Sequence, residues 1–146
     1  MTNTLVKFSN PLITKDGDQR AFVDFDGFKT LWFNTGTLCN IACSNCYIES
    51  SPRNDRLVYL SFADVVEFLN ELENISGKTC EIGFTGGEPF LNPDFLKMLE
   101  ECLRRNLSIM VLTNAMRPLQ NKIKGLLQLK ESFGAEKIVF RVSIDH

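Results

Sequence analysis

The sequence lacks the features of a protein that works on a membrane or along a nucleic acid. Its formal net charge is −2, and its short basic pairs are too small to form a basic surface. No stretch approaches the roughly 20 consecutive apolar residues of a membrane span, and the N-terminus has no apolar run of signal-peptide length. We therefore expect a cytoplasmic protein with no membrane partner and no nucleic-acid signature in this chain.

Histidine is also nearly absent, since His146 is the only one in the chain. Zinc sites are built mainly from cysteine and histidine, so the sequence offers few candidates for a fourth zinc ligand. Cysteine is more plentiful and unevenly placed, with three of the five cysteines between positions 39 and 46. In a reducing compartment such crowding indicates metal binding or catalysis more often than disulfides.

The order of the predicted elements favours an α/β fold. The composition, 44% hydrophobic and 23% charged, is that of an ordinary folded domain. From Lys29 onward, strand-like and helix-like segments alternate, and this alternation favours a parallel sheet. The predicted strands are residues 31–35, 80–84, 108–113 and 137–145, and the predicted helices are residues 61–72, 92–103 and 119–133.

Local signals predict where some of these elements begin. Ser61 and Asp64 resemble a capping box at the start of the first helix. Asn92-Pro93 is typical of a helix cap followed by proline in the first turn.

The first 28 residues have a different pattern. Asp16-Gly17 is a strong turn signal between two β-prone segments, residues 12–14 and 21–25. We therefore expect residues 1–28 to form an N-terminal β extension, a small hairpin, and residues 29–146 to form the core.

Chemically interesting residues lie just beyond each predicted strand, at its C-terminal end. The first strand runs into the three clustered cysteines, and the second runs into Gly86-Gly87-Glu88. The third ends next to Asn114, and the fourth contains Ser143 near its end. Ligands of parallel sheets and barrels bind at this edge. The four segments all fall at the same edge of the predicted sheet, and this convergence predicts one ligand site.

Cys39, Cys43 and Cys46 have a C-x3-C-x2-C spacing. Thiolates are the natural ligands of iron–sulfur clusters, and three cysteines in a tight loop can each bind one corner of a cubane. The fourth iron then has no ligand from this motif. An open metal position is typical of a site that binds a substrate, as it is for catalytic zinc.

The cysteine spacing after the first strand and Gly86-Gly87-Glu88-Pro89 after the second closely resemble the radical S-adenosylmethionine (SAM) superfamily, over about residues 29–146. The resemblance implies a partial (β/α) barrel of radical SAM type, with about four parallel strands and helices on its outer face, preceded by the small β-hairpin. It also implies an enzyme that holds a [4Fe–4S] cluster and binds SAM at the open iron. Such an enzyme cleaves SAM reductively to a 5′-deoxyadenosyl radical, which abstracts hydrogen from a substrate. A reductant such as flavodoxin or ferredoxin would supply the electron.

The resemblance extends to individual residues. It implies that the backbone near Gly86 and Gly87, together with the Glu88 carboxylate, binds the SAM amino group. It places Ser143 and Asn114 near the SAM ribose or the methionine carboxylate.

One position departs from the family pattern. The residue before the third cysteine is usually aromatic, but here it is Asn45, and the aromatic residue is Tyr47. This departure argues against an aromatic contact at position 45, but it says less against cluster binding.

Other interpretations stay open at the level of the residues. Gly-Gly-Glu can be an ordinary turn before a helix, and the polar face of the fourth strand can reflect an exposed sheet edge. The cysteines could serve a non-catalytic iron–sulfur module or a zinc-stabilised structural domain. A complete radical SAM domain has about six strand–helix units, so the resemblance predicts a core that is incomplete at its C-terminus. The sequence indicates neither the substrate nor the oligomeric state.

Overall fold

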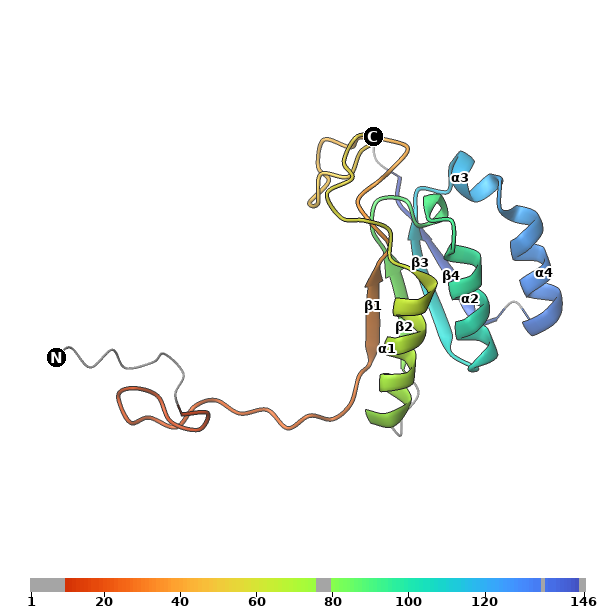
Figure 1. The fold of residues 1–146 in the computed structure, drawn as a ribbon. Helices are drawn as coiled ribbons and strands as arrows, with labels where there is room; N and C mark the ends of the chain where they lie inside the picture. The colour runs from red at the N-terminus through yellow and green to blue at the C-terminus, as the bar shows by residue number, and fades with distance from the viewer. Residues whose placement is uncertain (1–9, 76–79, 135, 145–146) are drawn as a thin grey trace.

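The centre of the computed structural model, which describes residues 10–75, 80–134 and 136–144, is a four-stranded sheet (Figure 1). Its strands lie side by side in chain order and every neighbouring pair is parallel. The sheet is open and does not close into a barrel. The predicted α/β class and four parallel strands are therefore confirmed. The strands are β1 (Thr30–Asn34), β2 (Glu81–Thr85), β3 (Ser108–Thr113) and β4 (Ile138–Val142).

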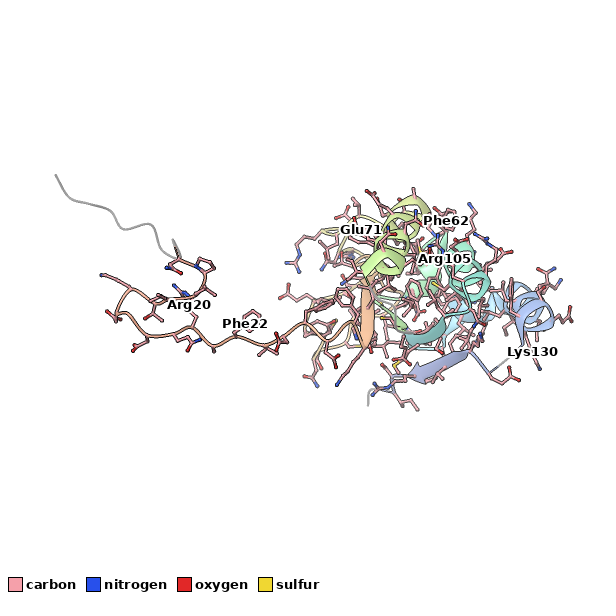
Figure 2. All side chains as sticks on the ribbon, turned by 90° about the horizontal axis from the view of Figure 1, so that it is seen from below. Arg20, Phe22, Phe62, Glu71, Arg105 and Lys130 are labelled. Atoms are coloured by element: carbon pink, nitrogen blue, oxygen red, sulfur yellow. The ribbon has the colours of Figure 1, made fainter. Side chains whose placement is uncertain are left out.

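The helices cover one face of this sheet, as the view along the strands shows (Figure 2). Parallel strands need crossover connections, which are usually helical, and here the connections return on the same side. No helix within the described ranges is long and apolar enough to cross a membrane. The helices are α1 (Phe62–Ile75), the 3-10 helix η1 (Pro89–Leu91), α2 (Phe95–Arg104), α3 (Arg117–Gln120) and α4 (Ile123–Phe133).

The core lies between the helices and the covered face of the sheet, and phenylalanines occupy its centre. Phe84 of β2 stacks on Phe33 of β1 at a centroid distance of 5.5 Å and meets Phe95 of α2 edge-on at 5.3 Å. Phe95 in turn meets Phe90 of η1 at 4.9 Å. Aromatic pairs of this geometry add to the free energy of area burial. They fix η1, which follows the Gly-Gly-Glu segment, to the core.

The predicted start of the first helix is confirmed in detail. The Asp64 amide donates to Ser61 Oγ at 3.2 Å, and the Ser61 amide donates to Asp64 Oδ2 at 3.1 Å. This reciprocal pair is a capping box with aspartate in place of glutamate.

Two other helix predictions differ from the structure. α2 begins at Phe95, two residues after the position that an Asn92 cap predicts. Asn92 Oδ1 still accepts from the Asp94 amide at 2.9 Å, and the same buried side chain donates to the carbonyl groups of Thr35 and Leu60. The predicted helix over residues 119–133 is divided into α3 and α4, because the Lys122 amide bonds to the Leu119 carbonyl three residues earlier. Such a bond closes a tighter turn than an α-helix.

The predicted N-terminal hairpin is present only as one antiparallel bridge, between Ile13 and Gln19. Residues 21–25 form no strand, so that part of the prediction is wrong. This segment runs away from the sheet, and Phe22, 75% exposed, has no packed surface beside it (Figure 2). A two-stranded hairpin needs a further packing partner to be stable. Residues 1–9 lie outside the described residues.

Glu101 of α2 is a buried carboxylate that links α2 to α1 through Arg105. It accepts hydrogen bonds from Arg104 at 2.6 Å and from Arg105 at 2.7 Å. Arg105 also donates to Glu73 at 3.1 Å and to Asn70 at 2.8 Å, both on α1. Burial alone would raise the pKa of Glu101, but the two arginines outweigh it and hold the pKa below its usual value.

We expect Glu101→Gln to lower the free energy of unfolding by about 2 kcal/mol at neutral pH, because the partly buried Arg105 guanidinium loses one of its two charged partners and keeps only the exposed Glu73. A carboxylate whose pKa is lowered by folding contributes stability above its unfolded pKa and loses it as the pH falls through its folded pKa. The two proteins should therefore converge in acid, as measured by urea unfolding. The exposed neighbour Glu100 gives the control, Glu100→Gln, and an equal loss in both variants would contradict this role of Glu101.

Candidate functional site

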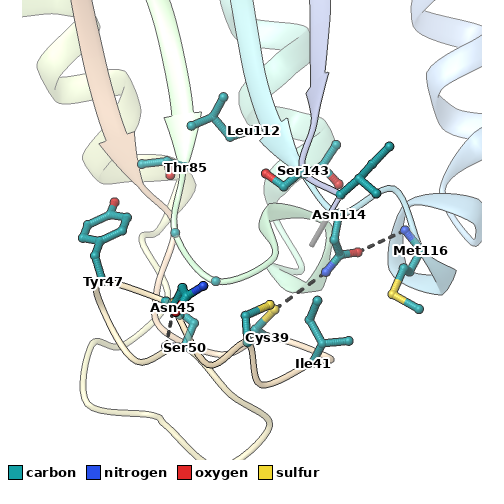
Figure 3. Close-up of a pocket in the computed structure, with 16 residues that line it drawn as sticks. Cys39, Ile41, Asn45, Tyr47, Ser50, Thr85, Leu112, Asn114, Met116 and Ser143 are labelled. Carbon is teal, nitrogen blue, oxygen red and sulfur yellow. Dashed lines mark hydrogen bonds between the residues drawn. The ribbon is translucent and has the colours of Figure 1, made fainter. Parts of the chain in front are cut away.

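The C-terminal ends of the strands open onto one pocket of about 540 Å³ (Figure 3). Its walls come from the cysteine loop after β1, the glycine loop after β2, and the chain at the ends of β3 and β4. The predicted convergence at this edge is therefore present in the structure. The pocket is lined by seven of the eight predicted site residues: Cys39, Cys43, Cys46, Gly86, Gly87, Asn114 and Ser143.

The glycine loop lies directly on the backbone of the cysteine loop. The Gly87 amide donates to the Gly36 carbonyl at 2.8 Å, and the Glu88 amide donates to the Leu38 carbonyl at 3.1 Å. A Cβ atom on Gly87 would collide with the Leu38 carbonyl, and one on Gly86 would lie 2.7 Å from the Gly36 oxygen. Gly86 also has a φ of +140°, which other residues rarely adopt. The sequence predicted close backbone approach to a ligand, and the close approach that the structure shows at these glycines is to the neighbouring loop.

Glu88 is the predicted site residue that the structure does not bring into the pocket wall. It is 1% exposed, and its carboxylate faces the end of β3. Its Oε2 atom accepts from the Asn114 amide at 2.9 Å, and its Oε1 atom accepts from Thr113 Oγ1 at 2.8 Å and from the Phe90 amide at 3.2 Å. Both oxygens are thus engaged in joining the glycine loop to β3, and the expected contact of this carboxylate with an amino group has no support in the geometry.

The three clustered cysteines are in no disulfide, and all three line the pocket. Cys39 is buried, and burial is the main reason that its pKa is raised. The Asn114 side chain donates to Cys39 Sγ at 3.7 Å, and the Ser50 amide donates to Cys46 Sγ at 3.2 Å. One hydrogen-bond donor therefore lies beside each of these two sulfur atoms, and a donor in this position favours the deprotonated form of a thiol.

The chemistry of the donor set fits an iron–sulfur cluster. Thiolates are the natural ligands of such clusters, and a cubane takes each thiolate on a different iron atom. All three thiols lie on the wall of one pocket. In the part of the chain that the structure describes, no three histidine, cysteine, aspartate or glutamate side chains form a group around a single metal ion.

Asn114 joins the end of β3 to the cysteine loop. Its Oδ1 atom accepts from the Met116 amide at 3.0 Å, and its Nδ2 atom donates to Asn40 Oδ1 at 2.9 Å as well as to Cys39 Sγ. These contacts fix the orientation of the amide group, which sequence reasoning could not do (Figure 3).

Ser143 reaches the pocket because pairing continues beyond β4. Its amide donates to the Thr113 carbonyl at 2.9 Å, which keeps the chain in register at the rim of the sheet. Asp145, assigned to the same predicted strand, and His146 lie outside the described residues. Both Asn45 and Tyr47 line the pocket, and Tyr47 is 81% exposed at its edge.

Sequence reasoning missed Ser50, which lines the same pocket and is buried. It is one of several serines in a polar loop, and no local pattern distinguishes it from exposed Ser44. Only the folded path of the loop reveals its position.

Comparison with known proteins identifies the family of this chain. Residues 33–145, well over half of the chain, match the model of the Radical SAM superfamily. The chain therefore belongs to this family. Proteins of the family use a [4Fe–4S] cluster and SAM.

Individual relatives share part of their length with this chain. The antilisterial bacteriocin subtilosin biosynthesis protein AlbA of Bacillus subtilis strain 168 is 32% identical over 112 residues, 73% of this chain and 22% of AlbA. YydG of the same organism, which its name assigns provisionally to peptide biosynthesis, is 37% identical over 79 residues, 52% of this chain and 23% of YydG. The 7-carboxy-7-deazaguanine synthase of Methanopyrus kandleri is 31% identical over 119 residues, 70% of this chain and 43% of the synthase. The chain thus spans less than half the length of each of these relatives.

We expect Gly87→Ala to lower the free energy of unfolding by about 1–3 kcal/mol, because the new methyl group meets a backbone carbonyl that cannot rotate away. Gly125→Ala is the matched control, since its methyl group meets only the flexible Leu96 side chain. Alanine in that helix should be neutral or stabilising by roughly 0.5–1 kcal/mol. Equal unfolding midpoints for Gly87→Ala and the unmodified protein would show that the loops are not in close contact.

Thiol alkylation should distinguish the pocket cysteines from those of the core. Burial raises the pKa of Cys102 to about 12, and it also raises the pKa of buried Cys80. The thiolate is the reactive form, so brief alkylation of the metal-free protein at mildly alkaline pH should modify Cys43 and Cys46 well before Cys102. Mass spectrometry of the peptides checks the order. Modification of Cys102 as fast as Cys46 would contradict the burial of the Cys102 side chain in α2.

Proposed function

We propose that this chain holds a [4Fe–4S] cluster on Cys39, Cys43 and Cys46 and binds SAM beside it. The observation that supports this most is the single pocket that contains all three thiols together with the Gly86-Gly87 backbone. When bound, the cluster would supply the electron that cleaves SAM to methionine and a 5′-deoxyadenosyl radical, for hydrogen abstraction from a substrate.

The residues of the pocket would divide the work of binding SAM. The carbonyl groups of Gly86 and Gly87 are our proposed acceptors for its amino group, because an amino N–H donates and the Gly87 amide, itself a donor, is bonded to the cysteine loop. Asn114 and Ser143 would offer polar side chains to the ribose or the carboxylate. Apolar side chains on the same wall, such as Ile41 and Leu112, would exclude water from the reacting centre.

The electron donor and the cellular location are also proposals. A low-potential reductant such as flavodoxin or ferredoxin would deliver the electron, and five cysteines without a disulfide among the described residues suit a reducing, cytoplasmic setting. The relatives differ in their named products, a bacteriocin in one case and 7-carboxy-7-deazaguanine in another. They therefore support a radical SAM enzyme without favouring one substrate.

The test is anaerobic reconstitution with iron and sulfide, followed by reduction with dithionite in the presence of SAM. We expect a cluster to assemble and 5′-deoxyadenosine to form, and we expect Cys43→Ala to abolish the product. Cys80→Ala is the control, because Cys80 is buried in the core away from the pocket. A cluster without product would favour the non-catalytic iron–sulfur module, and failure to assemble any cluster would contradict the proposal.

A further inference from the structure

Ser50 has a buried hydroxyl group whose partner is missing. The residue is 5% exposed. Among the described residues, its Oγ atom is the one buried side-chain nitrogen or oxygen that has no hydrogen-bond partner. The large majority of buried polar side-chain atoms are hydrogen-bonded, and an exception calls for an explanation such as an ordered water, a bound ion or a redox role. The hydroxyl is therefore available to a group that binds beside it.

The path of the cysteine loop places Ser50 beside the cluster ligands. The Glu49 amide donates to the Cys46 carbonyl at 3.0 Å, and Glu49 has a φ of +54°, so the chain turns back on itself after Cys46. The Ser50 amide then reaches Cys46 Sγ at 3.2 Å, while the residue lines the pocket with all three cysteines (Figure 3). The backbone of Ser50 is thus already bonded to a cluster-ligand sulfur.

We propose that Ser50 Oγ donates a hydrogen bond to a sulfur atom of the cluster and thereby raises the reduction potential of the cluster. This inference rests on the proposed function. Sulfur is the acceptor that this pocket would offer once the cluster is bound, either as a cysteine thiolate or as a bridging sulfide. Reduction adds negative charge to the cluster, so a donor stabilises the reduced state more than the oxidised state, and hydrogen bonds to the sulfurs are one determinant of cluster potentials.

The experiment compares midpoint potentials of the full, reconstituted chain without SAM, by redox titration monitored with electron paramagnetic resonance. We expect Ser50→Ala to keep its iron content and to shift the midpoint to a more negative potential. Ser50→Thr keeps the hydroxyl and should stay near the unmodified protein. Ser44→Ala is the matched control, because Ser44 is an exposed serine of the same loop that does not line the pocket. It should leave the midpoint unchanged.

An unchanged midpoint in Ser50→Ala would overturn the inference. A shift that occurs only when SAM is present would also overturn it, because the hydroxyl would then bond to SAM. If Ser50→Ala loses iron, restoration of the cluster by Ser50→Thr supports the hydroxyl, and loss in both variants shows a merely structural role. If the unmodified chain assembles no cluster, the proposed function itself fails and the inference falls with it.

Discussion

The contact between two loop backbones is the constraint on which the pocket depends. The loop after β2 lies so close to the loop after β1 that a side chain at Gly87 would collide with the Leu38 carbonyl. Two amide–carbonyl hydrogen bonds hold the loops together at this point. Because the strands are parallel neighbours, their C-terminal ends meet at one edge, and the glycines allow the loops to continue that proximity beyond the sheet. The cysteines and the proposed SAM-binding backbone are brought together by this contact.

The cysteine loop has little regular secondary structure, so it depends on other tethers. The Cys39 amide donates to the Ser51 carbonyl at 3.1 Å, which closes the loop on itself. The buried side-chain amide of Asn92 donates to the carbonyl of Thr35 at 3.2 Å and to that of Leu60 at 2.9 Å. These two bonds join the two ends of the segment that contains the cysteine loop. Backbone carbonyls buried without partners would be costly, and these bonds satisfy them. A loop fixed in this way can hold three thiols in place for a cluster.

The sequence predicted the features that are encoded locally. The alternation of strands and helices, the Ser61 capping box and the position of the cysteines are readable from spacing and residue type, and the structure contains them all. The sequence could not indicate contacts that a distant partner decides. Asn92 accepts from the Asp94 amide as a cap would, but its side chain also bonds to Thr35 and Leu60, and the Glu88 carboxylate is buried against β3. Ser50 lies buried in the pocket wall only because of the turn that precedes it, and no local sequence pattern indicates that position.

The most direct test of the account is Mössbauer spectroscopy of the reconstituted, iron-57-labelled protein with and without SAM. Three cysteine ligands leave one iron of a cubane without a protein thiolate, and SAM is proposed to bind there. The account predicts that SAM changes the signal of a single iron and leaves the others as they were. A spectrum in which SAM alters no iron, or one with no cubane signal at all, would contradict it.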